Sequence, residues 1–247
     1  MFSWITKLES STTSAKEILG LFEEMLHDGR HAFDLAANAL VGGTDPDTIK
    51  EDLWSTDKRI NQTERKIRRR LLTHSSTYGR GAFATDLVLM SLVKDAERIG
   101  DYAKNIFDLA ALGATFSPES HEDLTAKKFQ VSQMLVRAKD IYGSENEDQA
   151  REFIAEADAF CLNCDEQIDL LLKSEDGKST AAALAYRFFK RVVSHSLNII
   201  TSLVVPLDKL DYYDEDPSAP DKTYAKRGGF LPKINFDALH WGVPPSI

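Results

Sequence analysis

Residues 57–67 read Asp-Lys-Arg-Ile-Asn-Gln-Thr-Glu-Arg-Lys-Ile, and residues 158–168 read Asp-Ala-Phe-Cys-Leu-Asn-Cys-Asp-Glu-Gln-Ile. At an offset of 101 residues (158 − 57), both stretches have aspartate at the first position, an acidic residue at the eighth and isoleucine at the eleventh. The match extends outwards, because Val41-Gly-Gly and Tyr142-Gly-Ser fall on the same offset. The chain therefore contains one sequence unit twice.

Each copy has the pattern of three long helices. In the first copy, six apolar residues follow each other in alternating steps of four and three, which keeps them on one helix face: Leu92, Ala96, Ile99, Ala103, Ile106 and Ala110. Gly42-Gly-Thr-Asp-Pro46 provides a break, followed by a capping aspartate and a proline at the first helical position. Further breaks are predicted at 75–81, 113–120 and 174–177, where serine and glycine gather.

These patterns predict an all-α protein with two tandem three-helix repeats, packed as an elongated six-helix bundle with pseudo-twofold symmetry. We expect residues 1–115 to form repeat 1, residues 116–205 to form repeat 2, and residues 206–247 to form a Pro/Gly-rich extension. Proline and glycine at that density forbid a regular helix. The extension is too apolar for a purely solvated linker, so we expect it to fold back onto the bundle or to dock on a partner.

The composition excludes several function classes. The chain has 247 residues and a formal charge of −9, which argues against non-specific nucleic-acid binding. No run approaches the roughly 18 apolar residues of a spanning helix, and the first residues lack the basic start and apolar core of a signal peptide. A cytoplasmic location is therefore expected.

The third predicted helices of the two copies differ in charge. Glu97-Arg-Ile-Gly-Asp-Tyr-Ala-Lys-Asn-Ile106 aligns with Lys190-Arg-Val-Val-Ser-His-Ser-Leu-Asn-Ile199 at an offset of 93 (190 − 97). Lys190 replaces Glu97, and Ser194 replaces Asp101. At 100° per residue, four polar residues of the first copy lie opposite the apolar face: Glu97, Asp101, Asn105 and Asp108. Glu97 and Asp101 are one turn apart, so their oxygens can bind one hard cation.

A solvated helix face is the alternative, because basic residues lie three positions from these carboxylates and would form weak exposed ion pairs: Lys94, Arg98 and Lys104. Spacing alone favours this alternative. Gly100 argues against it, because glycine within a helix costs about 1 kcal/mol relative to alanine. That cost predicts a close approach by another group.

The run Asp95-Ala-Glu-Arg-Ile-Gly-Asp-Tyr-Ala-Lys-Asn-Ile106 resembles the signature of the PhoU family of phosphate-transport regulatory proteins. In that family, each of two three-helix repeats carries a Glu/Asp-x-x-x-Asp motif on its third helix. The resemblance extends over residues 10–205 and includes the number of repeats and helices. It implies a regulator rather than an enzyme.

The resemblance also implies ligands and partners. Glu97 and Asp101 would bind the metal, with Asn105 and then Asp108 as further candidates on the same face. The implied cofactor is a divalent or trivalent ion (Mg, Mn, Zn or Fe), or none. The implied partners are an ABC-type or sodium-coupled membrane phosphate transporter and a sensor histidine kinase. Membrane contact is expected only through such a partner, no nucleic acid is expected, and a homodimer is one assembly considered.

Repeat 2 departs from the family pattern. An ammonium repels a metal cation and a lone hydroxyl is a poor ligand, so Lys190 and Ser194 cannot form a conventional metal site. At most one such site is therefore expected. We expect Lys190 to pair instead with an acidic group on a partner or on the neighbouring repeat.

Other functions and motifs are weighed beside this one. A metal-dependent hydrolase or oxidase would need Glu97 and Asp101 to converge in a cleft with His27 or His31, and a structural adaptor would need no metal. Cys161 and Cys164 are interpreted as packing residues, because a zinc site needs a second ligand pair. The basic run 65–70 is interpreted as the solvated back of the second helix, with a patch for an acidic partner as the alternative.

Overall fold

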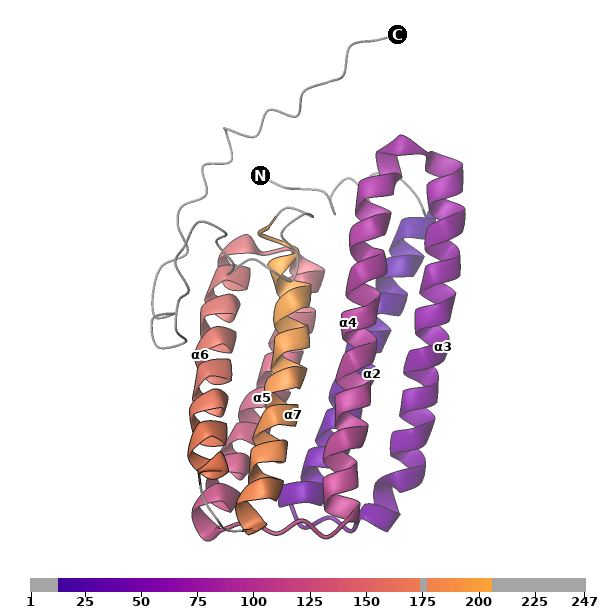
Figure 1. Ribbon diagram of the computed structural model, residues 1–247. Coiled ribbons are helices and arrows are strands. Elements are labelled where there is room, and N and C mark those ends of the chain that lie inside the picture. The colour runs from indigo at the N-terminus through magenta and orange to yellow at the C-terminus, as the bar shows by residue number, and fades with distance from the viewer. Residues whose placement is uncertain (1–12, 174–176, 206–247) are drawn as a thin grey trace. The chain divides into compact units, whose positions relative to one another are not determined.

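The computed structural model describes residues 13–173 and 177–205, which all belong to one compact unit. Figure 1 shows its six helices: α2 (Thr13–Val41), α3 (Pro46–Tyr78), α4 (Arg80–Ala111), α5 (Pro118–Ser144), α6 (Glu147–Leu172) and α7 (Gly177–Thr201). No strand occurs in the described ranges, which confirms the all-α prediction. The predicted extension 206–247 lies outside them. No described helix is both long and apolar enough to cross a membrane.

Capping residues set the predicted helix starts. The Asp45 side chain accepts a hydrogen bond from the backbone N–H of Asp47 at 3.0 Å, and Pro46 occupies the first position of α3. Ser117 caps α5 in the same manner. The predicted loop after α4 is therefore shorter than 113–120, because helix begins again at Pro118.

The predicted break at 75–81 is narrower still. Helix α3 continues to Tyr78, and Gly79, at a φ of +62°, turns the chain into α4. Two hydroxyls of this stretch fit a helix because they bind the backbone one turn earlier: Ser76 Oγ donates to the carbonyl of Leu72 at 2.8 Å, and Thr77 Oγ1 to that of Thr73 at 2.9 Å. A serine-rich stretch is thus helical where a loop was expected.

The predicted apolar residues form the core. On α4, five of the six are buried and Ala110 is half-buried. The corresponding residues of repeat 2, five on α7 and Leu203 in the turn after it, are all buried: Ala185, Phe189, Val192, Ser196, Ile199 and Leu203. The seven-residue series of α3, Leu53, Ile60 and Ile67, is also buried. Burial of these stripes supplies the main driving force for packing the helices.

Helices α3 and α4 form an antiparallel hairpin with a constant register. Lys104 Nζ pairs with Asp57 at 2.8 Å, and Ser75 Oγ donates to Asp86 at 2.5 Å. The step from Asp57 to Ser75 is as long as the step back from Lys104 to Asp86. A step of one residue forwards along α3 therefore corresponds to a step of one residue backwards along α4.

The two repeats meet where α4 and α7 run antiparallel and side by side (Figure 1). His195 Nδ1 lies 2.7 Å from a carboxylate oxygen of Asp95. At the offset of 93, exchanging the repeats converts the pair Asp95–His195 into Phe188–Tyr102. Those two rings are also in contact, with centroids 6.2 Å apart. The interface therefore reproduces its own contacts when the repeats are exchanged, as pseudo-twofold symmetry requires.

Candidate functional site

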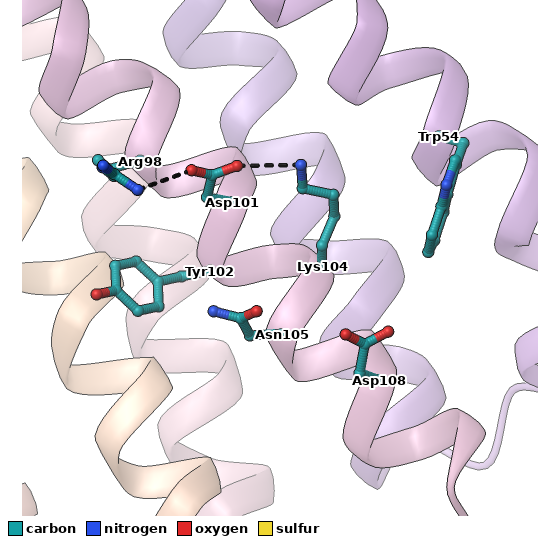
Figure 2. A pocket seen from close by; sticks show the side chains of 7 residues that line it. All are labelled: Trp54, Arg98, Asp101, Tyr102, Lys104, Asn105 and Asp108. Atoms are coloured by element: carbon teal, nitrogen blue, oxygen red, sulfur yellow. Dashed lines mark hydrogen bonds and ion pairs between the residues drawn. The ribbon is translucent and has the colours of Figure 1, made fainter.

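The outer face of α4 carries a shallow hollow of about 440 Å³. Figure 2 shows its lining: Trp54 from α3, and Arg98, Asp101, Tyr102, Lys104, Asn105 and Asp108 from α4. Three of the four polar residues placed on one face by sequence are thus found together there. Glu97 lies one turn before Asp101 on the same helix and outside the lining of the hollow.

Glu97 is more enclosed than a residue on an open helix face. Its side chain is 11% exposed, and its Oε2 lies 2.6 Å from Lys94 Nζ and 4.0 Å from Arg98 Nε. The carboxylate is therefore largely enclosed, and basic residues of its own helix already neutralise it. The Glu97 side chain is thus more enclosed than the solvated outer face that the sequence predicted.

Asp101 lies between two cations (Figure 2). Arg98 Nη1 donates to one carboxylate oxygen at 3.0 Å, and Lys104 Nζ lies 3.0 Å from the other. Lys104 also reaches Asp57 on α3, at 2.8 Å. Burial lowers the pKa of Lys104, but its hydrogen bonds to Asp57 and Asp101 outweigh this and raise the pKa overall. Lys104 is therefore a charged link between the two helices.

Asn105 and Asp108 continue the same face of α4 below Asp101 (Figure 2). Asp108 is exposed and Asn105 half-exposed. Within the described part of the chain, neither side chain has a hydrogen-bond or ion-pair partner. Their oxygens are the ones on this face that remain available to a ligand.

The structure adds Glu64, which sequence reasoning did not select as a site residue. Glu64 is seven residues after Asp57 and Glu97 is seven before Lys104, so the hairpin register places Glu64 opposite Glu97. The Glu64 side chain is only 10% exposed, and its Oε1 lies 2.9 Å from Arg68. The signal for it was present in the sequence, because Glu64 aligns with Asp165 in the internal repeat.

Repeat 2 shows what replaces this pair of carboxylates. Lys190 Nζ lies 2.6 and 2.5 Å from the two oxygens of Asp165 on α6. The expectation that Lys190 would pair with a partner or with the neighbouring repeat is therefore wrong, because an acidic residue of its own repeat lies within reach. Ser194 Oγ donates to the Lys190 carbonyl at 2.9 Å and so satisfies itself within α7.

Gly100 has a structural explanation. A Cβ atom at Gly100 would lie 2.9 Å from Ile60 Cδ1, closer than carbon atoms tolerate. The predicted close approach is thus made by a side chain of α3. Glycine at this position lets α3 and α4 pack closely beside the charged residues Glu97 and Asp101.

The donor chemistry of the α4 face suits a hard cation, because Glu97, Asp101 and Asn105 all offer oxygen. Their environment is less suitable, because Lys94, Arg98 and Lys104 already neutralise the two carboxylates. No group of three or more His, Cys, Asp or Glu side chains is placed to hold a metal ion among the described residues. A metal here would have to displace internal cations.

His27 and His31 take no part in this face. His31 Nε2 lies 3.0 Å from Asp52 Oδ2, between α2 and α3, and His27 is mostly exposed beside Asp28. The converging ligands that a metal-dependent hydrolase or oxidase needs are therefore not assembled within 13–173 and 177–205.

The other two motifs behave as interpreted from sequence. Cys161 and Cys164 are free thiols on α6, half-buried and buried. In the basic run 65–70, Ile67 is buried while Arg65 and Arg69 are exposed.

The comparisons with known proteins agree with this geometry. Residues 22–110, which span most of α2 to α4, match the family model described as the PhoU domain. No curated protein matches the chain. The resemblance inferred from residues 95–106 therefore coincides with an independent match over the first repeat.

Two solved structures share the fold over both repeats. PhoU from Pseudomonas aeruginosa is 20% identical, with a TM-score of 0.66 over 77% of this chain and 95% of its own. The phosphate transport system regulatory protein PhoU from Streptococcus pneumoniae is 19% identical, with a TM-score of 0.61 over 81% of this chain and 97% of its own. The resemblance to the PhoU family is thereby confirmed, with a PhoU domain in repeat 1 and the PhoU fold across both repeats.

Proposed function

We propose that this protein regulates phosphate uptake and phosphate-starvation signalling in the cytoplasm, by contact with a membrane phosphate transporter, a sensor histidine kinase or both. The observation that carries the proposal is the PhoU domain of residues 22–110 within a bundle of two three-helix repeats. The Streptococcus pneumoniae protein of the same fold is described as a phosphate transport system regulatory protein. We propose no catalytic role.

A divalent or trivalent metal ion on the α4 face is part of the proposal. Glu97, Asp101 and Asn105 would hold it, and the ion would supply charge neutralisation rather than chemistry. To bind, it would have to release Lys104 from Asp101, and Lys104 also joins α4 to Asp57 of α3. Metal binding would thus favour one packing of these two helices, and a partner that prefers this packing would sense it.

A metal-free adaptor is the second candidate, favoured by the ion pairs that already neutralise Glu97 and Asp101. In this case the charges of the α4 face would contribute only to helix packing and to partner contact. The two candidates predict different responses when these side chains are changed.

Metal analysis of the full-length protein by mass spectrometry separates them. The metal candidate predicts bound metal in the unmodified protein and its loss in Glu97→Ala and Asp101→Ala. Ser194→Ala, at the position equivalent to Asp101 in repeat 2, is the matched control and should keep the metal. Lys104→Met should raise metal affinity, because it removes the competing ammonium. A metal content that responds to none of these changes leaves the adaptor.

The regulatory role has its own test. Deletion of the protein should alter both phosphate uptake and phosphate-responsive transcription, and expression of the full chain should restore them. Unchanged uptake and transcription in the deletion strain would refute the regulatory proposal, whatever the metal content.

A further inference from the structure

We propose that the end of the α3–α4 hairpin docks on an anionic phospholipid surface. This docking surface, the basic tip, is the part of the hairpin formed by the distal half of α3 and the first turns of α4. It carries four apolar and three basic residues, all exposed: Leu72, Tyr78, Phe83, Leu87, Arg65, Lys66 and Arg69. The inference goes beyond the regulatory function and does not depend on it.

The hairpin projects past the first turn of α2 (Figure 1). Arg59 pairs with Asp28, and Arg70 pairs with Glu17, which fixes an antiparallel register between α2 and α3. In this register, the first residue of α2, Thr13, is level with residue 74. The apex around Gly79 therefore extends beyond the described start of α2.

A cluster of buried polar side chains joins the two helices near the apolar residues of the tip. Tyr78 lies against the ring of His74, with centroids 4.6 Å apart. His74 is buried and bound through Nδ1 to Asp86 at 3.0 Å, and Ser75 donates to the same carboxylate. This buried cluster joins α3 to α4 near the apex, and the exposed apolar residues lie on the two helices that it joins.

Two further apolar side chains lie on α4 at the same end. Phe83 and Leu87 are one turn apart on one helix face. Phe83 is 56% exposed, and Leu72 on α3 is 64% exposed. Apolar groups of this size insert favourably between lipid headgroups and the upper acyl chains.

The charge of the tip is opposite to that of the whole chain. Residues 62–90 contain six arginines and lysines and two acidic residues, in a chain with a net charge of −9. The two acids are internal, because Glu64 pairs with Arg68 and Asp86 with His74. Among the described residues, Lys66 and Arg69 have no carboxylate partner. These two charges are free to meet an anionic surface.

The equivalent hairpin of repeat 2 provides an internal comparison. Leu170 and Leu172 are exposed at the end of α6, with 71% exposure for Leu172. Residues 163–183 around them contain five acidic and two basic residues. Because α4 and α7 are antiparallel, the two hairpins lie at opposite ends of the bundle (Figure 1). Of these two hairpins, in the residues that the structure describes, the α3–α4 hairpin is the one that combines apolar exposure with positive charge.

This combination fits a lipid surface. Lys and Arg are attracted to the negative potential of anionic leaflets, and exposed apolar side chains add burial once contact is made. Lys66 and Arg69 lie about 15–20 Å before the apex along α3, so the hairpin would meet the surface with the side of its distal half and not with the apex alone.

Vesicle flotation with the full-length protein tests the proposal. The probes are vesicles of phosphatidylcholine alone and of phosphatidylcholine mixed with phosphatidylglycerol. We expect binding to the mixed vesicles only, weakened by salt. Lys66→Ala with Arg69→Ala should weaken binding about thirtyfold, the effect of two charges near an anionic surface. Phe83→Ser with Leu87→Ser should weaken it as well, and Leu170→Ser with Leu172→Ser is the matched control that should bind as the unmodified protein does.

Three results would overturn the proposal: no binding to mixed vesicles, equal binding to both kinds of vesicle, or binding that the tip variants leave unchanged. The alternative occupant of the basic tip is a second copy of the chain, and sedimentation of the unmodified protein without lipid tests it. Self-association that the tip variants abolish would also overturn the lipid proposal. Circular dichroism establishes that each variant is folded. Vesicle binding requires neither a transporter nor phosphate, so its failure is separate from failure of the regulatory function.

Discussion

Lys190 and Asp165 form in repeat 2 an ion pair whose counterparts in repeat 1, Glu97 and Glu64, are both carboxylates. Between the second and third helix, basic side chains therefore neutralise the carboxylates in both repeats, but these side chains come from different positions. In repeat 2, the ammonium of Lys190 replaces one carboxylate of the pair. In repeat 1, Lys94 and Arg68 each neutralise one carboxylate from its own helix.

Lys190→Glu should therefore destabilise the protein in the absence of metal. It replaces an ion pair with two facing carboxylates, and the loss of a partly buried charged hydrogen bond costs about 1–3 kcal/mol. The midpoint of urea unfolding should fall accordingly, and a divalent cation should recover part of it by binding between the carboxylates. The matched control is Lys58→Glu, the same charge change at an exposed lysine of α3, which should change stability by less than about 0.5 kcal/mol. Equal effects at the two positions would show that Lys190 has no special role.

Asp95→Asn should loosen the contact between the repeats. Asp95 is buried and binds both His195 Nδ1, at 2.7 Å, and Asn198 Nδ2, at 3.0 Å. Loss of the charge weakens two buried hydrogen bonds, and we expect about 2 kcal/mol of destabilisation in urea unfolding. Asp108→Asn is the control, because Asp108 is exposed on the same helix. If both variants unfold at the same urea concentration, the Asp95 contacts do not stabilise the interface.

The helices were predictable from sequence because their signals are local. Alternating steps of three and four placed Leu92 to Ile106 in the core of α4, and Asp45 with Pro46 fixed the start of α3. The α3–α4 turn was predicted too long, because Ser76 satisfies its hydroxyl within the helix and leaves Gly79 as the sole break. Local composition does not reveal which of these two outcomes a serine-rich stretch adopts.

The site was only partly predictable, because its partners come from another helix. Spacing on α4 found Glu97 and Asp101, and it also found the competing Lys94, Arg98 and Lys104. It could not show that Lys104 reaches across to Asp57, or that Glu64 faces Glu97, since both depend on the register of α3 against α4. The internal repeat contained the missing information, because Asp57 and Glu64 align with Asp158 and Asp165.

Gly100→Ala should have an effect that depends on Ile60. Alanine gains about 1 kcal/mol of helix propensity, but its Cβ would lie 2.9 Å from Ile60 Cδ1, so the net change should be near zero. Ile60→Val removes that methyl group and costs about 0.5–1.5 kcal/mol by itself. In this background, Gly100→Ala should stabilise by about 1 kcal/mol, as measured by a double-mutant cycle in urea.

Gly20 is the control for this cycle. It lies within α2, where an added Cβ meets no atom within 4 Å. Gly20→Ala should stabilise by about 1 kcal/mol in both backgrounds. Additive effects of Gly100→Ala and Ile60→Val would contradict the assigned contact.

The two thiols should be protected from alkylation in the folded protein. Burial raises the pKa of Cys161 to about 11 and that of Cys164 to about 12, whereas an unfolded cysteine has a pKa of about 8.5. Because the thiolate is the reactive form, iodoacetamide at pH 8 should modify the native protein at least about a hundredfold more slowly than the denatured protein. The native rate should rise about tenfold per pH unit up to pH 10, with Cys161 reacting before Cys164, while the denatured rate levels off above its lower pKa. Cys161→Ser and Cys164→Ser assign each rate by mass spectrometry. Rapid native modification at pH 8 would mean that α6 opens, or that these thiols lie in a more polar environment than the packing positions described.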